Sequence, residues 1–364
     1  MNKAYDFLIL IKEPIEKAPP IISIAVMLAR NDFTVKLVCG SINNDLHLYF
    51  QEHNIEIVNL NVKYNQKYGT ILSKVVFWLK FRIKANKLIV KNDFKYLYLA
   101  TADTAISLYK LINKTNYFLH LRELYDTNKI YLFILKQISK NSVDIIVPEI
   151  NRAYLYLKYF DLPELPIIIP NRSVDHPQTK KMSISFLSND LQTKLKSKRN
   201  IIFQGIISKQ RDISNFIKVL DKFDNFNLIL LGENFGMLES YKKISSNIIH
   251  IDFISPPLHL NVTSWADIGI ICYDFSDLNH IYCAPNKLYE YSGFSIPILC
   301  SENPGIKYPV ERNNIGISTN FNQPNEILSA LNSLIADFNI FEANSKSFYK
   351  NSNYDISKKL KLNE

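Results

Sequence analysis

The sequence predicts an α/β protein with two tandem parallel-sheet domains. Short apolar runs alternate with segments of helical periodicity along nearly the whole chain, which is typical of β-α-β units. At 364 residues the chain is too long for one ordinary core. The alternation stops in the polar, charged stretch 171–199 and starts again at residue 200. We therefore expect two Rossmann-like domains that face each other across a cleft.

The first domain is predicted to span residues 1–170. Its apolar runs predict strands near residues 5–11, 34–39, 55–60, 96–100, 116–121, 144–148 and 167–169. The last run ends at Pro170, where the composition becomes polar. Residues 171–199 are predicted to form a linker region.

The second domain is predicted to span residues 200–340. Strands are expected at 200–204, 227–231, 248–251, 267–272 and 297–300. Helices are expected at 212–223, 235–244, 285–292 and 324–338. The tail 341–364 is mostly helical in pattern and is predicted to pack back toward the first domain.

Composition indicates a cytoplasmic protein. Hydrophobic residues make up 47% and charged residues 21%, and no apolar run approaches the ~18–20 residues of a membrane-spanning helix. The apolar run 7–11 leads into Lys12-Glu13-Pro14 without a small-residue cleavage site, so it predicts a buried strand and no signal peptide. The four cysteines lack metal-ligand spacing and are expected to be buried thiols.

Positive charge is concentrated in the first half of the chain. Residues 1–170 carry 22 Lys and Arg against 15 Asp and Glu, and residues 171–364 carry 21 against 19. Residues 57–92 contain no acid, and their basic residues are Lys63, Lys67, Lys74, Lys80, Arg82, Lys84, Lys87 and Lys91. Such a bias suits a polyanionic partner: an acidic membrane surface, a phosphorylated acceptor or nucleic acid.

The loop after the strand 200–204 is a candidate diphosphate site. Gly205 permits a tight turn, and Lys209 and Arg211 lie where the loop meets the next helix. Two cations at the carboxyl end of the domain's first strand can bind a diphosphate. The alternative is that these two side chains are simply solvated.

A second candidate lies in the segment 283–300, CAPNKLYEYSGFSIPILC. Pro285 suits a first helical position, and Lys287 and Glu290, three residues apart, share one face of the predicted helix. The Glu290 carboxylate can accept hydrogen bonds from both hydroxyls of a ribose, while Lys287 faces phosphate. The alternative is an ordinary Lys–Glu pair on an exposed helix.

Together these segments resemble the C-terminal domain of bacterial GT-B glycosyltransferases that build surface polysaccharides from nucleotide sugars, the group 1-like type. The matching motifs are Gly205…Arg211, Leu231-Gly232, Ala266-Asp267-Ile268-Gly269-Ile270, Asn279, Pro285-x-Lys287-x-x-Glu290, Pro297 and Asn303-Pro304-Gly305-Ile306. The resemblance covers about 150 residues, and the first half adds only His120-x-x-Glu123 and Val147-Pro148-x-x-x-Arg152-Ala153. It implies that Glu290 binds the nucleotide ribose and Arg211 the diphosphate. The expected donor-binding set is Gly205, Lys209, Arg211, Asn286, Lys287 and Glu290.

The sequence departs from this group in three places. Tyr282 stands where relatives carry a second acid that faces the donor sugar, and Ser295 stands where a glycine is expected. Lys12-Glu13-Pro14 follows the first strand, where many relatives have a Gly-Gly pair. The identity of the sugar and the stereochemical course are therefore left open.

The first domain is expected to supply the acceptor side and any catalytic base. His120 and Glu123 follow the strand residues Tyr117–Leu119, and either could take a proton from an acceptor hydroxyl. The alternative is that His120 belongs to the strand itself and is partly buried and hydrogen-bonded.

No metal or cofactor is expected. The sequence has no Asp-x-Asp and no His, Asp and Glu cluster with ligand spacing, so Arg211, Lys209 and Lys287 would stabilise a departing diphosphate instead. The segment 72–91 interleaves Phe77, Trp78 and Phe81 with basic residues, which fits a helix in the interface of the cytoplasmic membrane. A Rossmann surface helix with a solvated basic face competes closely, and nucleic-acid binding is disfavoured.

The resulting hypothesis is a metal-independent glycosyltransferase that acts on a lipid-linked or surface glycan, in lipopolysaccharide, capsule or exopolysaccharide assembly, at the inner face of the cell membrane. Two alternatives stay open. One is a sugar-nucleotide epimerase on the same fold, which needs several converging catalytic acids. The other is a glycosyltransferase-like binding subunit with little activity of its own.

Overall fold

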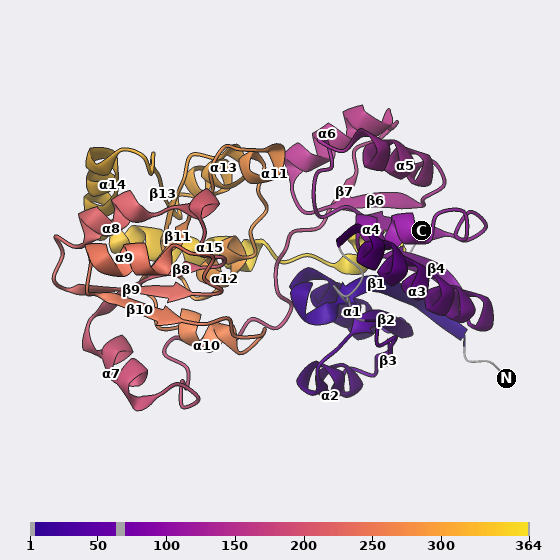
Figure 1. Cartoon of the computed structure of the whole chain (residues 1–364), viewed down its shortest axis with the longest axis horizontal. Coiled ribbons are helices and arrows are strands. Elements are labelled where there is room, and N and C mark those ends of the chain that lie inside the picture. The colour runs from indigo at the N-terminus through magenta and orange to yellow at the C-terminus, as the bar shows by residue number, and fades with distance from the viewer. Residues whose placement is uncertain (1–3, 63–69, 363–364) are drawn as a thin grey trace. The chain divides into compact units, whose positions relative to one another are not determined.

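The computed structural model describes residues 4–62 and 70–362 (Figure 1). Lys63 and Lys67, which were counted in the acid-free basic stretch, lie outside the described residues. The chain divides into two units, one formed by Met1–Val174 with Tyr354–Glu364 and the other by Asp175–Asn353. Within the described ranges, no helix is both long enough and apolar enough to cross a membrane.

The first unit contains a seven-stranded parallel sheet with the order β3-β2-β1-β4-β5-β6-β7. The strands are β1 (Ala4–Pro14), β2 (Val35–Ser41), β3 (Glu56–Asn59), β4 (Asp93–Leu99), β5 (Tyr117–His120), β6 (Asp144–Val147) and β7 (Ile167–Ile168). The order reverses between β1 and β4, which is the point where doubly wound sheets open a ligand crevice.

Helices cover this sheet on both faces. They are α1 (Pro19–Arg30), α2 (Asn44–Glu52), α3 (Thr70–Lys91), α4 (Ala102–Ser107), α5 (Lys129–Ser139), α6 (Ile150–Phe160) and α16 (Ile356–Lys359), with a 3-10 turn η1 (Ile15–Lys17). Phe7, Ile9 and Ile11 of β1 share one core with α1, α2 and α16 because alternate strand residues point to the same face. Helix α4 contacts β1, β4 and β5.

The second unit contains a six-stranded parallel sheet with the order β10-β9-β8-β11-β12-β13. The strands are β8 (Arg199–Gln204), β9 (Phe226–Leu231), β10 (Ile248–Ile251), β11 (Ile268–Ile271), β12 (Ile298–Cys300) and β13 (Gly316–Ser318). The order reverses between β8 and β11. The carboxyl ends of these two strands are therefore the expected ligand-binding point of this sheet.

Two buried clusters lie in the second unit, each with its own set of helices. The helices are α7 (Asn189–Ser197), α8 (Ser214–Leu220), α9 (Leu238–Ile244), α10 (His259–Thr263), α11 (Leu278–Ile281), α12 (Lys287–Gly293), α13 (Pro304–Arg312), α14 (Pro324–Ala336) and α15 (Phe338–Asn351), with a 3-10 turn η3 (Lys209–Arg211). One cluster contains side chains of α8, α9 and α14, and the other contains side chains of α7, α10, α12 and α13.

The two parallel-sheet domains confirm the predicted fold class, and the predicted strands agree with the structure to within a few residues. Sequence reasoning missed β13, α7, α10, α11 and α13 because they are short or lie in polar stretches. Two local details were wrong. Helix α12 begins at Lys287 and not at Pro285. The predicted tail is split, since α15 belongs to the second unit and α16 to the first.

Candidate functional site

The candidate site lies at the β8–β11 switch point of the second sheet. Gly205 follows β8 with φ +140°, and Gly232 follows β9 with φ +144°. The Gly205 amide donates to the Leu231 carbonyl at 2.9 Å, and a Cβ on Gly232 would lie 2.1 Å from the Gly205 carbonyl oxygen. Both positions favour glycine because of φ, and Gly232 also because of space.

Arg211 and Lys287 converge on Gly205. A Cβ added to Gly205 would lie 3.2 Å from Arg211 Nη1 and 4.0 Å from Lys287 Cε. Both cations line one small pocket, together with Gln204 and Tyr273. The Arg211 guanidinium lies over the Tyr273 ring at 4.7 Å, a cation–π contact that holds it in place. Gly205 and Lys287 are 82 positions apart in sequence. Residues from distant segments of the chain therefore meet at this point.

Glu290 completes the group from the next turn of α12. Its side chain is buried, at 7% exposure. Gln204 Nε2 donates to Oε2 at 2.9 Å, and His259 Nε2 lies 3.3 Å from Oε1. Gln204 also lines the pocket that Arg211 and Lys287 share. Glu290 therefore bonds to a residue of the pocket that contains the two cations. The alternative of an ordinary Lys–Glu pair on an exposed helix does not match this burial.

The electrostatics of the site follow from this burial. Burial by itself would raise the pKa of Glu290, but His259, Lys287 and His176 outweigh it and lower that pKa to about 2. The pKa of Lys287 is lowered by burial and by Arg211, against the opposing effect of Glu290. The site thus pairs an ionised carboxylate with two neighbouring cations. A bound anion would relieve the repulsion between those cations.

Two further predicted residues lie beside this group. Lys209 is exposed in η3 and lines a hollow of about 540 Å³ along the carboxyl edge of the sheet. This hollow shares Cys272 and Tyr273 with the small pocket, so it adjoins Arg211. Asn286 precedes α12 and its backbone carbonyl accepts from the Glu290 amide at 2.9 Å. Its side chain makes no capping hydrogen bond.

In the first unit, His120 is fully buried at the end of β5. Its Nδ1 lies 3.0 Å from the Tyr98 hydroxyl, and its Nε2 has no hydrogen-bond partner among the described residues. Burial, with a smaller contribution from Arg122, lowers the pKa of His120 to about 3. This environment corresponds to the alternative of a buried strand histidine. A catalytic role for His120 stays a prediction.

Glu123 differs from His120 in being exposed. Its Oε2 lies 3.4 Å from Arg152 Nη1, and Arg152 also donates to the Arg122 carbonyl. Glu123 and Arg152 belong to the two first-half motifs that entered the resemblance, and the structure brings them into contact. The contact gives Glu123 and Arg152 a structural role. The proposed role of Glu123 as a base stays a prediction.

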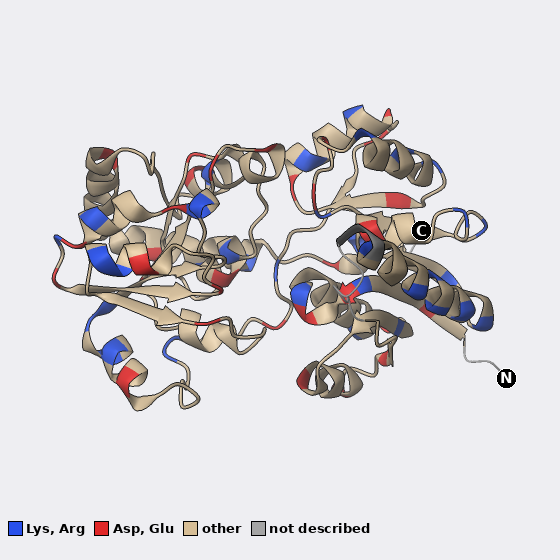
Figure 2. Ribbon diagram, in the orientation of Figure 1, with Lys and Arg blue, Asp and Glu red and all other residues tan. Residues whose placement is uncertain are grey.

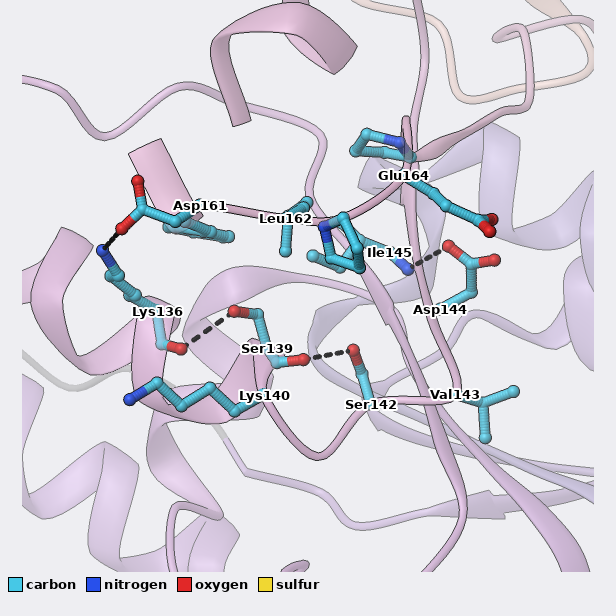
Figure 3. A pocket seen from close by; sticks show the side chains of 13 residues that line it. Lys136, Ser139, Lys140, Ser142, Val143, Asp144, Ile145, Asp161, Leu162 and Glu164 are labelled. Atoms are coloured by element: carbon cyan, nitrogen blue, oxygen red, sulfur yellow. Dashed lines mark hydrogen bonds and ion pairs between the residues drawn. The ribbon is translucent and has the colours of Figure 1, made fainter. Parts of the chain in front are cut away.

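A hollow of about 670 Å³ in the first unit lies away from the expected ligand-binding edge (Figure 3). It is lined by the last turns of α5 and α6 and by Asp144, the first residue of β6. Lys136 pairs there with Asp161, and burial raises the pKa of Asp144. Because ligands of doubly wound sheets bind beyond the carboxyl ends of strands, we assign this hollow no part in the site.

Sequence reasoning missed the residues that hold Glu290. Gln204 precedes Gly205 directly, so its position at a strand end was a usable signal. His259 and His176 gave no signal, because each is an isolated histidine in a loop or a short helix. His176 Nε2 lies 3.0 Å from the Glu290 carbonyl, and its ring packs on Phe294 at 4.3 Å.

Comparison with known proteins identifies the fold. No protein-family model matches the chain, and no curated protein matches it in sequence. Solved structures do resemble it. HepE from Anabaena, in complex with UDP-glucose, has a TM-score of 0.71 at 12% identity, over 98% of this chain and 97% of that one. WaaG, described as a glycosyltransferase of lipopolysaccharide biosynthesis, has a TM-score of 0.60 at 12% identity, over 99% and 98%.

A third similar structure is sucrose-phosphate synthase from Thermosynechococcus elongatus, with a TM-score of 0.67 at 12% identity, over 100% of this chain and 94% of that one. These structures are GT-B glycosyltransferases. The chain therefore has the GT-B fold, as the resemblance implied. It covers these relatives over nearly their full length.

Proposed function

We propose that the chain is a glycosyltransferase that moves a sugar from a nucleoside-diphosphate sugar to a glycan or lipid-linked acceptor, without a metal ion. The observation that carries this proposal is the meeting of Gly205, Arg211, Lys287 and Glu290 at the switch point of one sheet. The donor's diphosphate would lie against the two cations. Its ribose would lie against the carboxylate.

The chemistry of the step fits these groups. An acceptor hydroxyl attacks the anomeric carbon and loses its proton to a base, the bond from that carbon to the diphosphate breaks, and the diphosphate leaves with the electron pair. Arg211 and Lys287 would stabilise the negative charge that develops on the leaving group. HepE was solved with UDP, with UDP and glucose, and with UDP-glucose, which supports a nucleotide-sugar donor for this fold.

For the acceptor, we propose a glycan held at an anionic membrane surface, to which α3 binds. Exposed apolar side chains recur every four residues along this helix: Val75 (47% exposed), Leu79 (52%) and Ile83 (58%). Exposed lysines alternate with them, and Figure 2 shows α3 without acidic residues. An apolar stripe flanked by cations is typical of a helix in a membrane interface.

The aromatic side chains of this segment do not belong to that stripe. Phe81 is fully buried, and the Lys12 ammonium lies over the rings of Phe77 at 5.2 Å and Trp78 at 4.8 Å. The expectation that the aromatic residues of this segment face a membrane interface is therefore corrected for Phe81. The aliphatic residues take the exposed positions instead.

The test is to incubate the protein with labelled UDP-, GDP-, dTDP- and CMP-sugars and a bacterial membrane lipid extract. Transfer of label to the lipid or glycan fraction supports the proposal. Conversion of the donor to an isomer would support an epimerase instead. Nucleotide binding, measured by thermal shift, without either product would support a binding subunit. No binding to any nucleotide would overturn the donor site itself.

A further inference from the structure

One short helix, α10, contacts Glu290 by two separate routes. His259, its first residue, places Nε2 3.3 Å from Glu290 Oε1. Thr263, its last residue, donates from its hydroxyl to Gln204 Oε1 at 2.8 Å. Gln204 in turn donates from Nε2 to Glu290 Oε2 at 2.9 Å. Both oxygens of the carboxylate are thus held from the same element.

The Glu290 carboxylate and the Thr263 hydroxyl together set the Gln204 amide. An ionised carboxylate only accepts hydrogen bonds, so the donor Nε2 faces it, and the Thr263 hydroxyl then donates to Oε1. His259 and Thr263 are both buried, at 8% and 0% exposure, and so is Glu290. The contacts are therefore made away from bulk solvent.

The charged and titratable groups around Glu290 come from several elements. Lys287 lies on the same helix with Arg211 next to it, His259 lies on α10, and His176 precedes α7. Tyr291, on the same helix, is buried with its pKa raised well above its ordinary value, so it stays neutral. His259 is first among the groups that lower the pKa of Glu290 against the effect of burial.

A ribose hydroxyl donates its hydrogen, so it needs an ionised, correctly turned carboxylate as acceptor. We infer that α10 is the positioning element of the nucleotide site: His259 holds Oε1 of the Glu290 carboxylate, and Thr263, through Gln204, holds Oε2. This inference rests on the proposed function for the identity of the ligand. The contacts among the four residues do not depend on it.

The first experiment uses the full chain and two substitutions at one position. His259→Phe keeps a ring but removes the donor, and His259→Gln retains a side-chain N–H donor without a titratable ring. The dissociation constant is measured from pH 5 to 8 for whichever of UDP, GDP, dTDP and CMP gives the largest thermal shift. We expect His259→Phe to weaken binding about tenfold at pH 5.5, with the deficit shrinking as pH rises, because burial then raises the pKa of Glu290.

We expect His259→Gln, which keeps the hydrogen bond but lacks the ring's charge, to retain affinity within about threefold, with a pH dependence between those of the wild type and His259→Phe. His47→Phe, at a half-exposed histidine of α2 in the other unit, is the matched control and should leave affinity unchanged. A folded His259→Phe protein with wild-type affinity at every pH would overturn the inference. A purely structural role would instead lower affinity equally at all pH values, which also overturns it.

Two measurements keep the outcome decisive. If His259→Phe does not fold, Thr263→Val removes one hydroxyl with little change of shape, and we expect about threefold weaker binding. If the wild-type protein binds no nucleotide, the proposed function fails, but ¹³C NMR of the Glu290 carboxyl still tests the inference. A titration of Glu290 that is shifted upward most in His259→Phe and less in His259→Gln supports it, and identical titrations in all three contradict it.

Discussion

Gln204 and Glu290 are joined by a 2.9 Å hydrogen bond although 86 residues separate them in sequence. The bond ties the last residue of β8 to the middle of α12, across the point where the strand order reverses. It brings the carboxylate next to the pocket that contains Arg211 and Lys287. The two sequence motifs therefore form one site.

The first prediction concerns the ribose contact of Glu290. Glu290→Gln preserves shape but removes the charge, so we expect the affinity for a ribonucleoside diphosphate to fall about 10- to 100-fold, the range for hydrogen bonds to a charged group. Isothermal titration with UDP and 2′-deoxy-UDP tests the mechanism, because the two ligands differ by one hydroxyl. Wild-type protein should prefer UDP, and the variant should lose this preference.

The control for this prediction is Glu326→Gln, which removes an exposed carboxylate in the first turn of α14. Its affinity should match that of the wild type. If Glu290→Gln keeps both its affinity and its preference for the 2′-hydroxyl, Glu290 does not contact the ribose.

The second prediction compares two glycines with positive φ. Gly205→Ala and Gly236→Ala both force alanine into a left-handed backbone, at φ +140° and +94°. Each should destabilise the fold by about 1–3 kcal/mol. Only the Cβ at Gly205 meets a side chain of the site, Arg211, whereas the one at Gly236 has nothing within 4 Å.

We therefore expect Gly205→Ala alone to weaken diphosphate binding, by about tenfold if the displaced guanidinium loses one charged hydrogen bond. Denaturant titration measures the first effect and calorimetry the second. Equal diphosphate affinities in the two variants would show that a side chain at position 205 does not displace Arg211.

The third prediction concerns Ser295, at the position where the resemblance implies a glycine. Its φ is +57°, in the left-handed region that glycine tolerates best. Ser295→Gly should raise the free energy of unfolding by about 0.5–1 kcal/mol, since relief of strain exceeds the added entropy of the unfolded chain. Ser295→Ala keeps the strain and should not stabilise. A less stable glycine variant would contradict this account.

The fourth prediction concerns pH. The pKa of Glu290 is about 2 in the folded protein, against an ordinary value of 4.5. A depressed carboxyl pKa stabilises the fold above the unfolded value, and this contribution is lost as pH falls from about 4.5 toward 2. Its size is on the order of 2–3 kcal/mol. Urea titrations of wild-type and Glu290→Gln proteins at pH 7, 5, 4 and 3 should show a stability difference that shrinks with falling pH. A constant difference would show that the charge of Glu290 is not responsible.

The fifth prediction concerns α3. Leu79→Glu with Ile83→Glu places two acids in the exposed apolar stripe, so we expect binding to vesicles of phosphatidylglycerol and phosphatidylcholine to fall at least about tenfold. Leu48→Glu, an exposed leucine of α2, is the matched control. Sedimentation at low and high salt measures both. The membrane proposal would be contradicted if the wild-type protein does not bind the anionic vesicles, or if the double variant binds them as well as the wild type does.

Much of the fold could be predicted from the sequence because its signals are local. Buried parallel strands appear in the sequence as apolar runs, such as residues 7–11 and 227–231. In the helices between them, apolar residues recur with a period of about 3.6 residues. Strand β13 was missed because three residues carry no periodicity. The start of α12 was misplaced because Pro285, two residues earlier, suits a helix start equally well.

The candidate site could be predicted only in part. Gly205 and Arg211 were found because they stand in the loop after a predicted strand, and Lys287 and Glu290 because they share one face of a predicted helix. Their partners Gln204, His259 and Thr263 make contacts 31 to 86 residues away in sequence, and such contacts leave no local pattern. The burial of His120 likewise depends on Tyr98, which comes from another strand.

By itself, the sequence determined the fold class, the two-domain organisation and which loops carry cations and acids, because these depend on neighbouring residues along the chain. The tertiary structure decided that Glu290 is buried and ionised and that Arg211 and Lys287 share a pocket. It also decided that aliphatic side chains, and not Phe81, are exposed on α3. Burial and electrostatic coupling depend on how distant segments pack, and only the folded chain brings those segments together.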